Sequence, residues 1–375
     1  MKDIKMKRVV VKVGSALIAP DGKGCNSRHM LPIAQFIREF QQQGIEVVLV
    51  SSGAVAAGRI HIAHGSANPS IAAKQAMASV GQSQLMAQWQ RFFDGPCSQL
   101  LITHGDLKDR ARYINIKNTL RLLLENNILP IVNENDTVAT QELKVGDNDN
   151  LAALVAMVCD ADALLILSDV NGVYDADPRS NKEAQLISQI DHIDDAVFAM
   201  AGGTRNHLAT GGMRTKIEAA QKACEHGIHT YIINGSDSDS FKAFLAAQNP
   251  GTHFVANRSL KKAKKHWLKH TLLSQGSVVI DKGAITALLE RGASLLASGI
   301  KEIYGDFIKG ETVNITAHCG TRILAKGIVQ YSSNELQRIM GKNSAQIVEI
   351  LGFCPSVEVI HRDDMVLLVE EVEED

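Results

Sequence analysis

Two apolar segments near the start of the chain end in residues that could contact an anion. Lys12 lies near the end of the first segment and is followed by Gly14, so a cation stands beside a turn whose backbone amides can approach a phosphate or a carboxylate. The second segment runs into Ser51, Ser52 and Gly53, after which a helix is expected. Amides at a helix N-terminus attract anions, but either serine would also serve as an ordinary helix cap. Both interpretations stay open from the sequence.

The densest group of short polar side chains lies near the middle of the chain. Asn133 and Asp136 follow another apolar segment, and the stretch 146–150, which includes Asn148 and Asp149, directly precedes an apolar helix. One of these residues would cap the helix, but capping does not account for the others. We therefore expect part of this group to bind a ligand. A calcium loop is excluded, because the further oxygen ligands and closing glutamate of an EF-hand are absent.

The segment 210–216 combines glycines, hydroxyl groups and basic residues before a helix predicted over 217–226. Its residues are Thr210, Gly211, Gly212, Met213, Arg214, Thr215 and Lys216. Two glycines allow a tight loop against a phosphate, and Lys216 on the first helical turn would bring a positive charge to a transferred group. Neither the P-loop spacing nor Gly-x-Gly-x-x-Gly is present. The segment predicts a nucleotide-binding loop of another kind.

The elements that must position these residues alternate between apolar runs and helical spacings over the first 235 residues. The runs predict strands at 8–13, 45–50, 99–103, 128–132, 163–167 and 229–233. Ser168 and Asp169 directly follow one of them. This alternation predicts an α/β fold with a mainly parallel sheet sandwiched by helices. Ligands of such sheets bind beyond the carboxyl ends of the strands, where the polar residues lie.

The pattern changes near residue 250, and a second, mostly β domain is expected. We predict a first domain over 1–252, a basic linker over 253–275, a second domain over 276–362 and an acidic tail over 363–375. Strands of the second domain are expected at 277–280, 310–316, 325–329 and 357–360, and helices at 284–291 and 334–340. A length of 375 residues suits two domains.

Composition excludes several classes of protein. The net charge is -2, with 39 Lys+Arg against 41 Asp+Glu, so the whole chain is not an electrostatic binder of nucleic acid. The six cysteines form no Cys-x-x-Cys pair, which argues against zinc and disulfide frameworks and favours the cytoplasm. No apolar run is long enough to span a membrane. The basic and apolar start leads into a glycine turn and is predicted to be a first strand, not a signal peptide.

Seven motifs occur in an order that resembles the amino-acid kinase family, and within it the members that phosphorylate glutamate. They are KVGSAL, VSSGAVAAGR, KQAMASVGQSQLM, PIVNENDTVAT, KVGDNDNLAALVA, LLILSDVNGVYDADPR and TGGMRTK, the last at residues 210–216. The stretch 276–315 is similar to a PUA domain, a small pseudo-barrel. The resemblance covers the chain almost from end to end.

The resemblance implies phosphorylation of the side-chain carboxylate of L-glutamate by ATP and Mg²⁺, the first step of proline biosynthesis, with feedback inhibition by L-proline. By position, Lys12 and Lys216 match lysines that stabilise the transferred phosphoryl group, and Asp149 matches the acid that orients them. Glutamate would contact Ser52, Gly53, Asn133, Asp136 and Asn148. The ATP site would include Lys12, Gly14, Ser168, Asp169 and the segment 210–216. Magnesium would be carried on the ATP phosphates, and its protein ligands stay unknown.

Two alternatives stay open from the sequence. The first is another kinase of the same fold, acting on N-acetylglutamate, aspartate, carbamate or UMP. Asp136 argues against N-acetylglutamate, because an acidic residue pairs favourably with a free ammonium group and N-acetylglutamate has none. An RNA-binding protein is suggested by the second domain and by the basic stretch 261–269, although charges over 276–362 nearly balance. The family also implies a dimer or tetramer and a partnership with glutamyl-phosphate reductase.

Overall fold

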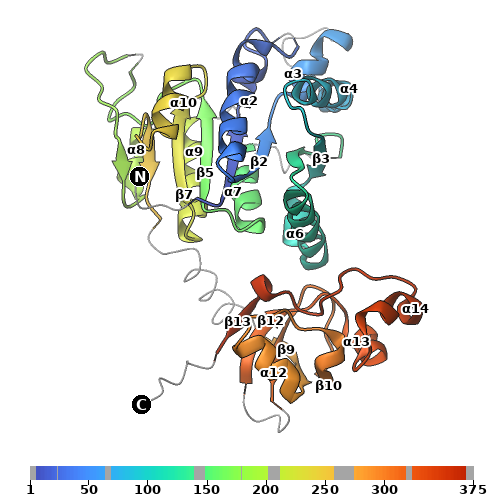
Figure 1. The fold of residues 1–375 in the computed structure, drawn as a ribbon. Helices are drawn as coiled ribbons and strands as arrows, with labels where there is room; N and C mark the ends of the chain where they lie inside the picture. Colours follow the sequence, from blue (N-terminus) through green and yellow to red (C-terminus); the bar gives the residue numbers. More distant parts are fainter. Residues whose placement is uncertain are drawn as a thin grey trace. The chain divides into compact units, whose positions relative to one another are not determined.

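The computed structural model describes residues 6–22, 24–63, 69–138, 148–178, 180–201, 212–256, 274–317 and 323–368 (Figure 1). They form two compact units. The first comprises the described residues of 1–107 and 116–260, and the second those of 108–115 and 261–375. Each unit contains a sheet and a hydrophobic core of its own.

The first unit is built on an eight-stranded sheet with the order β3-β4-β2-β1-β5-β7-β8-β6. Its strands are β1 (Arg8–Val13), β2 (Glu46–Ser51), β3 (Cys97–Ile102), β4 (Leu129–Glu134), β5 (Ala163–Ser168), β6 (Gln189–Ile190), β7 (His229–Asn234) and β8 (Thr252–Phe254). The six strands from β3 to β7 in this order are parallel, and β8 runs antiparallel to β7. The six predicted strands and the mainly parallel α/β fold are confirmed.

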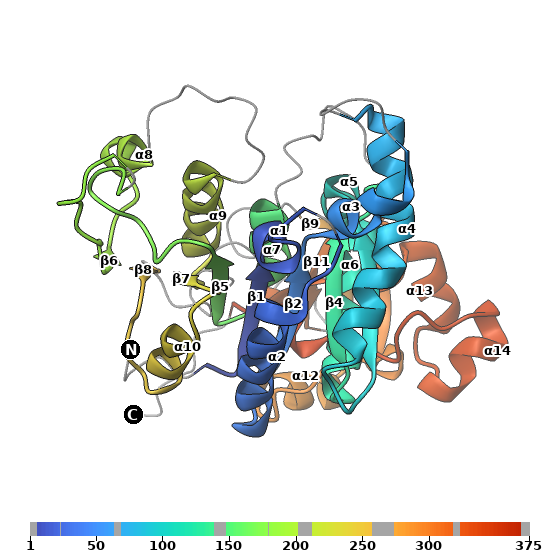
Figure 2. The same cartoon turned by 90° about the horizontal axis from the view of Figure 1, so that it is seen from above.

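Helices cover both faces of this sheet (Figures 1 and 2). They are α1 (Ser15–Ile18), α2 (Ser27–Gln42), α3 (Ala54–Gly58), α4 (Ile71–Gln90), α5 (His104–Lys108), α6 (Arg110–Glu125), α7 (Asn148–Val158), α8 (Asp195–Met200), α9 (Met213–Glu225) and α10 (Ser238–Leu245). Helices α2, α4 and α10 share one hydrophobic core with β1, β2, β4, β5 and β7. Helices α7 and α9 pack together and against β1, β5 and β7. No helix in the described part of the chain could cross a membrane.

The central strands of the sheet consist mainly of apolar side chains that are buried. Val9, Val10, Val11 and Val13 of β1 are fully buried, and β-branched residues of this kind favour extended backbone. A strand that is buried on both faces has a nearly continuous run of apolar residues, and this is the case for β1 and β5. Lys12 interrupts the run in β1 and is nevertheless buried. A buried lysine needs a compensating partner.

Helices α3 and α4 cross with their backbones in contact, which only glycine permits. A Cβ atom on Gly81 would lie 1.9 Å from the carbonyl oxygen of Ala54 and 2.4 Å from the amide nitrogen of Gly58. A Cβ atom on Gly58 would lie 1.9 Å from the carbonyl oxygen of Met77. The two glycines therefore fix α3 directly behind the loop that follows β2.

The second unit contains a five-stranded sheet with the order β10-β9-β11-β12-β13. Its elements are β9 (Ser274–Ile280), α12 (Lys282–Leu289), β10 (Ile300–Gly305), β11 (Thr312–Thr316), β12 (Ile323–Ile328), α13 (Ser333–Ile339), α14 (Ile347–Leu351) and β13 (Met365–Leu367). Only the β9 and β11 pair is parallel. The three predicted strands at 277–280, 310–316 and 325–329 and both predicted helices are present.

The second unit also differs from the sequence expectation. The strand expected at 357–360 is wrong: Ile360 forms only an isolated bridge with Leu295, because Val359 and Ile360 are held by single backbone bonds and not by a ladder. Strand β10 was not expected, since Lys301 and Glu302 interrupt its apolar pattern. Strand β13 lies within the segment expected to be an acidic tail and pairs with β12.

We expect Gly81→Ala to destabilise the first unit by about 2 kcal/mol or more, because the added methyl group overlaps backbone atoms of α3 that cannot move independently. Scanning calorimetry of the full chain measures the change. Gly95→Ala makes the same chemical change where a Cβ atom meets nothing within 4 Å, and should stay within about 0.5 kcal/mol of the parent. Equal stabilities of the two variants would show that α3 and α4 can separate freely.

Candidate functional site

Two lysines from different elements meet at one aspartate. Lys12 lies in β1, Asp149 in the first turn of α7, and Lys216 in the first turn of α9. Lys216 Nζ donates to Asp149 Oδ2 at 3.0 Å, and Lys12 Nζ forms an ion pair with Oδ1. The side chains of Lys12, Lys216 and Asp149 are 4%, 8% and 0% exposed. The sheet and both helices thus hold a buried charge cluster at the carboxyl end of β1.

The charges of this cluster depend on one another. Burial by itself raises the pKa of Asp149, but the ammonium groups of Lys12 and Lys216 outweigh burial and hold the pKa at about 2. The carboxylate is therefore ionised at neutral pH and keeps two cations side by side. Thr215 Oγ1 also donates to Asp149 Oδ2, at 3.1 Å. Such a cluster can attract a second anion, since within the described residues its two positive charges are shown paired with one carboxylate.

The start of α9 adds backbone donors to the cluster. Gly212 occupies the N-cap position and provides no side-chain cap, so the first amides of this 13-residue helix are not satisfied by a cap side chain. Arg214 is directed elsewhere: it pairs with Glu218 at 3.1 Å and lies 5.6 Å from the ring centre of Phe198. Met213 is the first residue of the helix, while Thr210 and Gly211 lie outside the described residues.

A chain of amide and hydroxyl groups continues from the cluster. Asn148 Nδ2 donates to Ser52 Oγ at 2.8 Å and to Asn133 Oδ1 at 2.9 Å. Asn133 Nδ2 donates to Gln82 Oε1 at 2.9 Å, and Gln82 Nε2 donates to Gln99 Oε1 at 3.1 Å. Because Asn148 precedes Asp149 in the same helical turn, this polar chain begins beside the lysines. It links the ends of β2 and β4 to α4 and β3.

The loop after β2 is not built by a serine cap. The N-cap of α3 is Gly53, which has φ 109° and no capping side chain. A Cβ atom there would lie 2.6 Å from Ile18, so only glycine suits this left-handed position. Ser51 Oγ accepts from the Trp89 indole at 2.9 Å, and Ser52 is bound to Asn148. The capping alternative is wrong for both serines.

A small pocket of about 270 Å³ lies at the far end of the polar chain. Its lining residues are Ala54, Ala78, Ser79, Gln82, Ser83, Gln99, Leu101, Glu134, Asn135, Asp136 and Thr137. None of them is basic, whereas two are carboxylic acids. Burial, followed by the negative charge of Glu134, raises the pKa of Asp136 to about 6. The pocket therefore favours a group that carries positive charge.

Ser168 and Asp169 lie at the end of β5, the strand next to β1. Ser168 Oγ donates to Asp169 Oδ1 at 3.2 Å. In the described part of the chain, no hydrogen bond or ion pair joins either residue to the lysine cluster. Gly14 is closer: a Cβ atom there would be 3.8 Å from Lys12 Nζ. These residues border the cluster on the β5 side.

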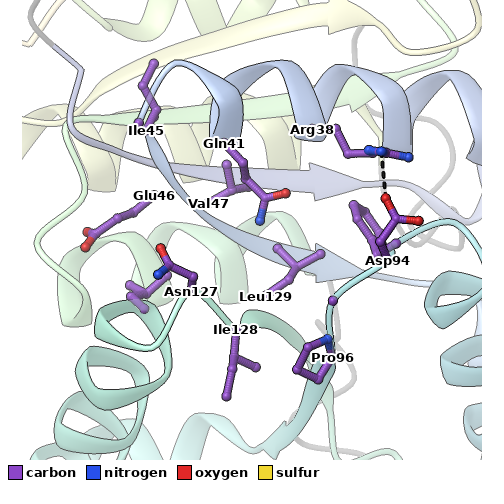
Figure 3. Close-up of a pocket in the computed structure, with 14 residues that line it drawn as sticks. Arg38, Gln41, Ile45, Glu46, Val47, Asp94, Pro96, Asn127, Ile128 and Leu129 are labelled. Carbon is purple, nitrogen blue, oxygen red and sulfur yellow. Dashed lines mark hydrogen bonds and ion pairs between the residues drawn. The ribbon is translucent and has the colours of Figure 1, made fainter.

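A larger pocket of about 350 Å³ lies at the opposite ends of the strands (Figure 3). It is lined by the first residues of β2 and β4, among them Glu46, Val47 and Leu129, and Arg38 and Asp94 form an ion pair of 2.7 Å at its edge. None of the residues predicted to bind a ligand lines it. Ligands of open parallel sheets bind at the carboxyl ends, so size alone does not make this pocket the site.

Some residues of the site were not predicted from the sequence. Gln82 lies inside helix α4, where the strand-end rule gives no signal. Gln99 lies within β3, and its place in the polar chain depends on the register between β3 and β4. Glu134 directly follows Asn133 at the end of the same predicted strand. The strand-end rule that selected Asn133 could therefore have selected Glu134 as well. His104, 3.8 Å from Glu134, begins the short helix α5.

Residues 7–234 match the amino acid kinase family, and residues 276–351 match the PUA domain. A glutamate 5-kinase from Idiomarina loihiensis is 52% identical over 368 residues, which cover 98% of this chain and 99% of that protein. A glutamate 5-kinase from Salinibacter ruber is 49% identical over 364 residues, 96% of this chain and 97% of that protein. A solved carbamate kinase from Giardia lamblia bound to AMP-PNP aligns at 20% identity and a TM-score of 0.48, covering 67% of this chain and 99% of that chain. The two sequence relatives match both regions of the chain.

We expect Asp149→Asn to destabilise the first unit by about 3 kcal/mol, because it removes a buried carboxylate that Lys12 and Lys216 share. Asp94→Asn, which removes a carboxylate that is 86% exposed, should change stability by less than about 0.5 kcal/mol. Urea unfolding at pH 7 measures both.

The same comparison has a pH signature. The pKa of Asp149 is held at about 2, below its unfolded value near 4, so its stabilisation is complete above about pH 4 and disappears as the pH falls toward 2. The difference between the parent and Asp149→Asn should shrink over that interval. A difference that is already absent at pH 7 would contradict the charge cluster as a source of stability.

Proposed function

The chain belongs to the amino acid kinase family, and from this we propose that the site at the ends of β1, β2 and β4 phosphorylates the side-chain carboxylate of L-glutamate with Mg²⁺-ATP. The product is L-glutamyl 5-phosphate, the first intermediate of proline biosynthesis. The observation that carries the proposal is the buried cluster of Lys12, Asp149 and Lys216 beside an uncapped helix N-terminus, in a chain about half identical to glutamate 5-kinases over nearly its full length.

The nucleotide lies on the lysine side of the site. Lys12 and Lys216 stabilise the negative charge of the γ-phosphoryl group during transfer, and Asp149 orients both ammonium groups. The amides at the start of α9, from Gly212 to Thr215, receive phosphate oxygens. Gly14, Ser168 and Asp169 border the nucleotide, and we assign Thr210 and Gly211, which lie outside the described residues, to the same binding segment. Burial strengthens these interactions, because little water screens them.

Glutamate lies on the side of the polar chain. Ser52, Asn133 and Asn148 offer hydroxyl and amide groups to its carboxylates, and Gly53, at a position that only glycine suits, contributes the backbone of the turn before α3. Asp136 accepts the α-ammonium group in the pocket that two carboxylic acids line. This arrangement favours L-glutamate over N-acetylglutamate, whose amide nitrogen carries no charge. Aspartate is shorter, while carbamate and UMP carry no α-ammonium group.

This chemistry needs no general base. A carboxylate is already ionised at neutral pH, so transfer requires in-line positioning and cations that offset the repulsion between two anions. The described cluster supplies cations and amide donors. Magnesium, bound to the ATP phosphates, neutralises further negative charge and keeps most of its water ligands. Within the described residues no group of three acidic, histidine or cysteine side chains forms a metal site, and we assign no protein ligand to it.

Several further features are proposed from the family. L-Proline inhibits the enzyme by binding at a site that overlaps the glutamate site. The protein is a cytoplasmic homo-oligomer, a dimer or tetramer, and delivers its labile product to glutamyl-phosphate reductase. The domain boundaries at residues 252, 275 and 362 belong with these proposals.

For the second domain we propose a structural or regulatory role. Its charges nearly balance over 276–362, which gives little attraction for an RNA backbone, and the basic stretch 261–269 lies outside the described residues. A chain truncated after residue 275 should keep its kinase activity and change in regulation or assembly. Binding of tRNA that persists at physiological salt would favour the RNA-binding alternative instead.

We expect ADP formation with L-glutamate and trapping of the acyl phosphate as a hydroxamate with hydroxylamine. Lys216→Ala should lower kcat by at least about a hundredfold, because a buried cation at the transferred phosphoryl group is lost. Free proline should suppress the reaction. N-Acetylglutamate and aspartate, assayed in parallel, identify the substrate.

Lys242→Ala is a matched control, since this exposed lysine pairs with nearby Asp239 on the surface of α10 and its loss should leave the rate unchanged. Hydroxamate from N-acetylglutamate at the same rate would contradict the role of Asp136. ADP formation with another acid but not with glutamate would agree with the fold and contradict the proposed substrate.

The pocket generates a pH prediction. The pKa of Asp136 is raised to about 6, and only the ionised carboxylate attracts an ammonium group, so kcat/KM for glutamate should fall about tenfold per pH unit below pH 6. Asp136→Asn should lower kcat/KM at pH 8 and remove this acidic limb. Asp94→Asn should keep the limb, and an unchanged limb in Asp136→Asn would assign it to another group.

A further inference from the structure

Glu134 is a buried carboxylic acid for which the polar chain offers no side-chain donor. It is the last residue of β4 and is 5% exposed. Among the described residues, its Oε1 atom has no hydrogen-bond partner. His104 lies close to it: its Nδ1 atom is 3.8 Å from Oε1, beyond hydrogen-bond distance, and has no hydrogen bond to another described residue. Burying a carboxylate with so little compensation costs free energy unless positive charge arrives from elsewhere.

The pocket next to Glu134 is where positive charge would arrive. Glu134 and Asp136 line it together, two positions apart in the sequence, and none of the described residues that line it is a lysine, arginine or histidine. Burial and, after it, the negative charge of Glu134 raise the pKa of Asp136, so the two carboxylates repel each other. Two carboxylates at short range in a buried site hold one positive charge in common, whether a proton or another cation.

We propose that Glu134 is a positioning residue that acts through Asp136 and makes the pocket select substrates with a free α-ammonium group. The inference rests on the proposed function and deepens it. When L-glutamate binds, its ammonium group supplies the one positive charge that the carboxylate pair requires. A dicarboxylic acid of the same length without the amine brings only negative charge to the pair and is repelled.

The alternative is that a charged group of the protein itself, and not the substrate, neutralises Glu134. His104 lies on α5, and Asp106 of the same helix is bound to the backbone amide and hydroxyl group of Thr103 at 2.8 and 2.6 Å. If a protonated His104 were the permanent counter-ion of Glu134, the pair would be neutral before substrate binds. Glu134 would then contribute structure but no selectivity.

The test compares L-glutamate with glutarate, which has both carboxylates and no amine. The hydroxamate assay gives KM and kcat for glutamate and the inhibition constant for glutarate. Glu134→Gln should raise KM for glutamate roughly tenfold, leave kcat within about twofold, and leave glutarate binding equal or tighter. Glu134→Asp keeps the charge and should recover most of the selectivity.

Controls separate selectivity from folding. Asp94→Asn makes a carboxylate-to-amide change outside the pocket and should leave both constants unchanged. His104→Gln should also preserve the preference for glutamate. The rise in unfolding temperature caused by each compound provides a second readout that needs no turnover.

Two results would overturn the inference. One is a Glu134→Gln variant that binds glutamate and glutarate as the parent does, or that weakens both equally. The other is a loss of selectivity in His104→Gln as large as that in Glu134→Gln. Absence of hydroxamate from the parent with glutamate would instead refute the proposed function, and the two failures are thus distinguishable.

Discussion

The buried contact between Asp149 and two lysines is the interaction on which the site depends. Lys12 comes from the central strand, and Lys216 from a helix that begins more than 200 positions later in the chain. Two ammonium groups would repel each other strongly at this degree of burial, and the carboxylate between them makes their proximity tolerable. The requirement to neutralise charge therefore ties β1, α7 and α9 together, and apolar packing of the two helices supports it. In the proposed function, a phosphate group of ATP relieves the remaining repulsion.

The first turn of α7 couples the two halves of the site. Asp149 faces the lysines, whereas its neighbour Asn148 reaches Ser52 and Asn133. Adjacent residues on a helix differ in direction by about 100°, so one turn can serve two neighbouring groups. Any shift of this turn moves the carboxylate that pairs with the cations and the Asn148 amide together. In the proposed function, this turn therefore couples the position of the nucleotide to that of the acceptor.

The sequence was informative where residue type and position in an element agree. Strands such as β1 and β5 are long apolar runs, and their ends hold Lys12 and Ser168 as expected. The role of Gln82 could not be predicted from the sequence, because its contact with Asn133 depends on how α4 crosses the sheet. That crossing depends in turn on Gly58 and Gly81, and single glycines in a helical pattern give no direction of packing. Strand β10 was missed for a simpler reason: an exposed edge strand needs few apolar side chains.

Positive and negative side chains lie at opposite ends of the site. Lysines gather on one side of Asn148, and the carboxylic acids Glu134 and Asp136 line a pocket reached on the other side through Asn133 and Gln82. The proposed substrate is also asymmetric: the α end of L-glutamate carries an ammonium group beside a carboxylate, and the other end carries a carboxylate alone. In the reversed orientation the side-chain carboxylate would face the two acids and the ammonium group would face the lysines. In the proposed function, specificity against that orientation thus comes from repulsion as well as from attraction. The reacting carboxylate then reaches the cations because the ammonium group has its favourable partners at the opposite end of the site.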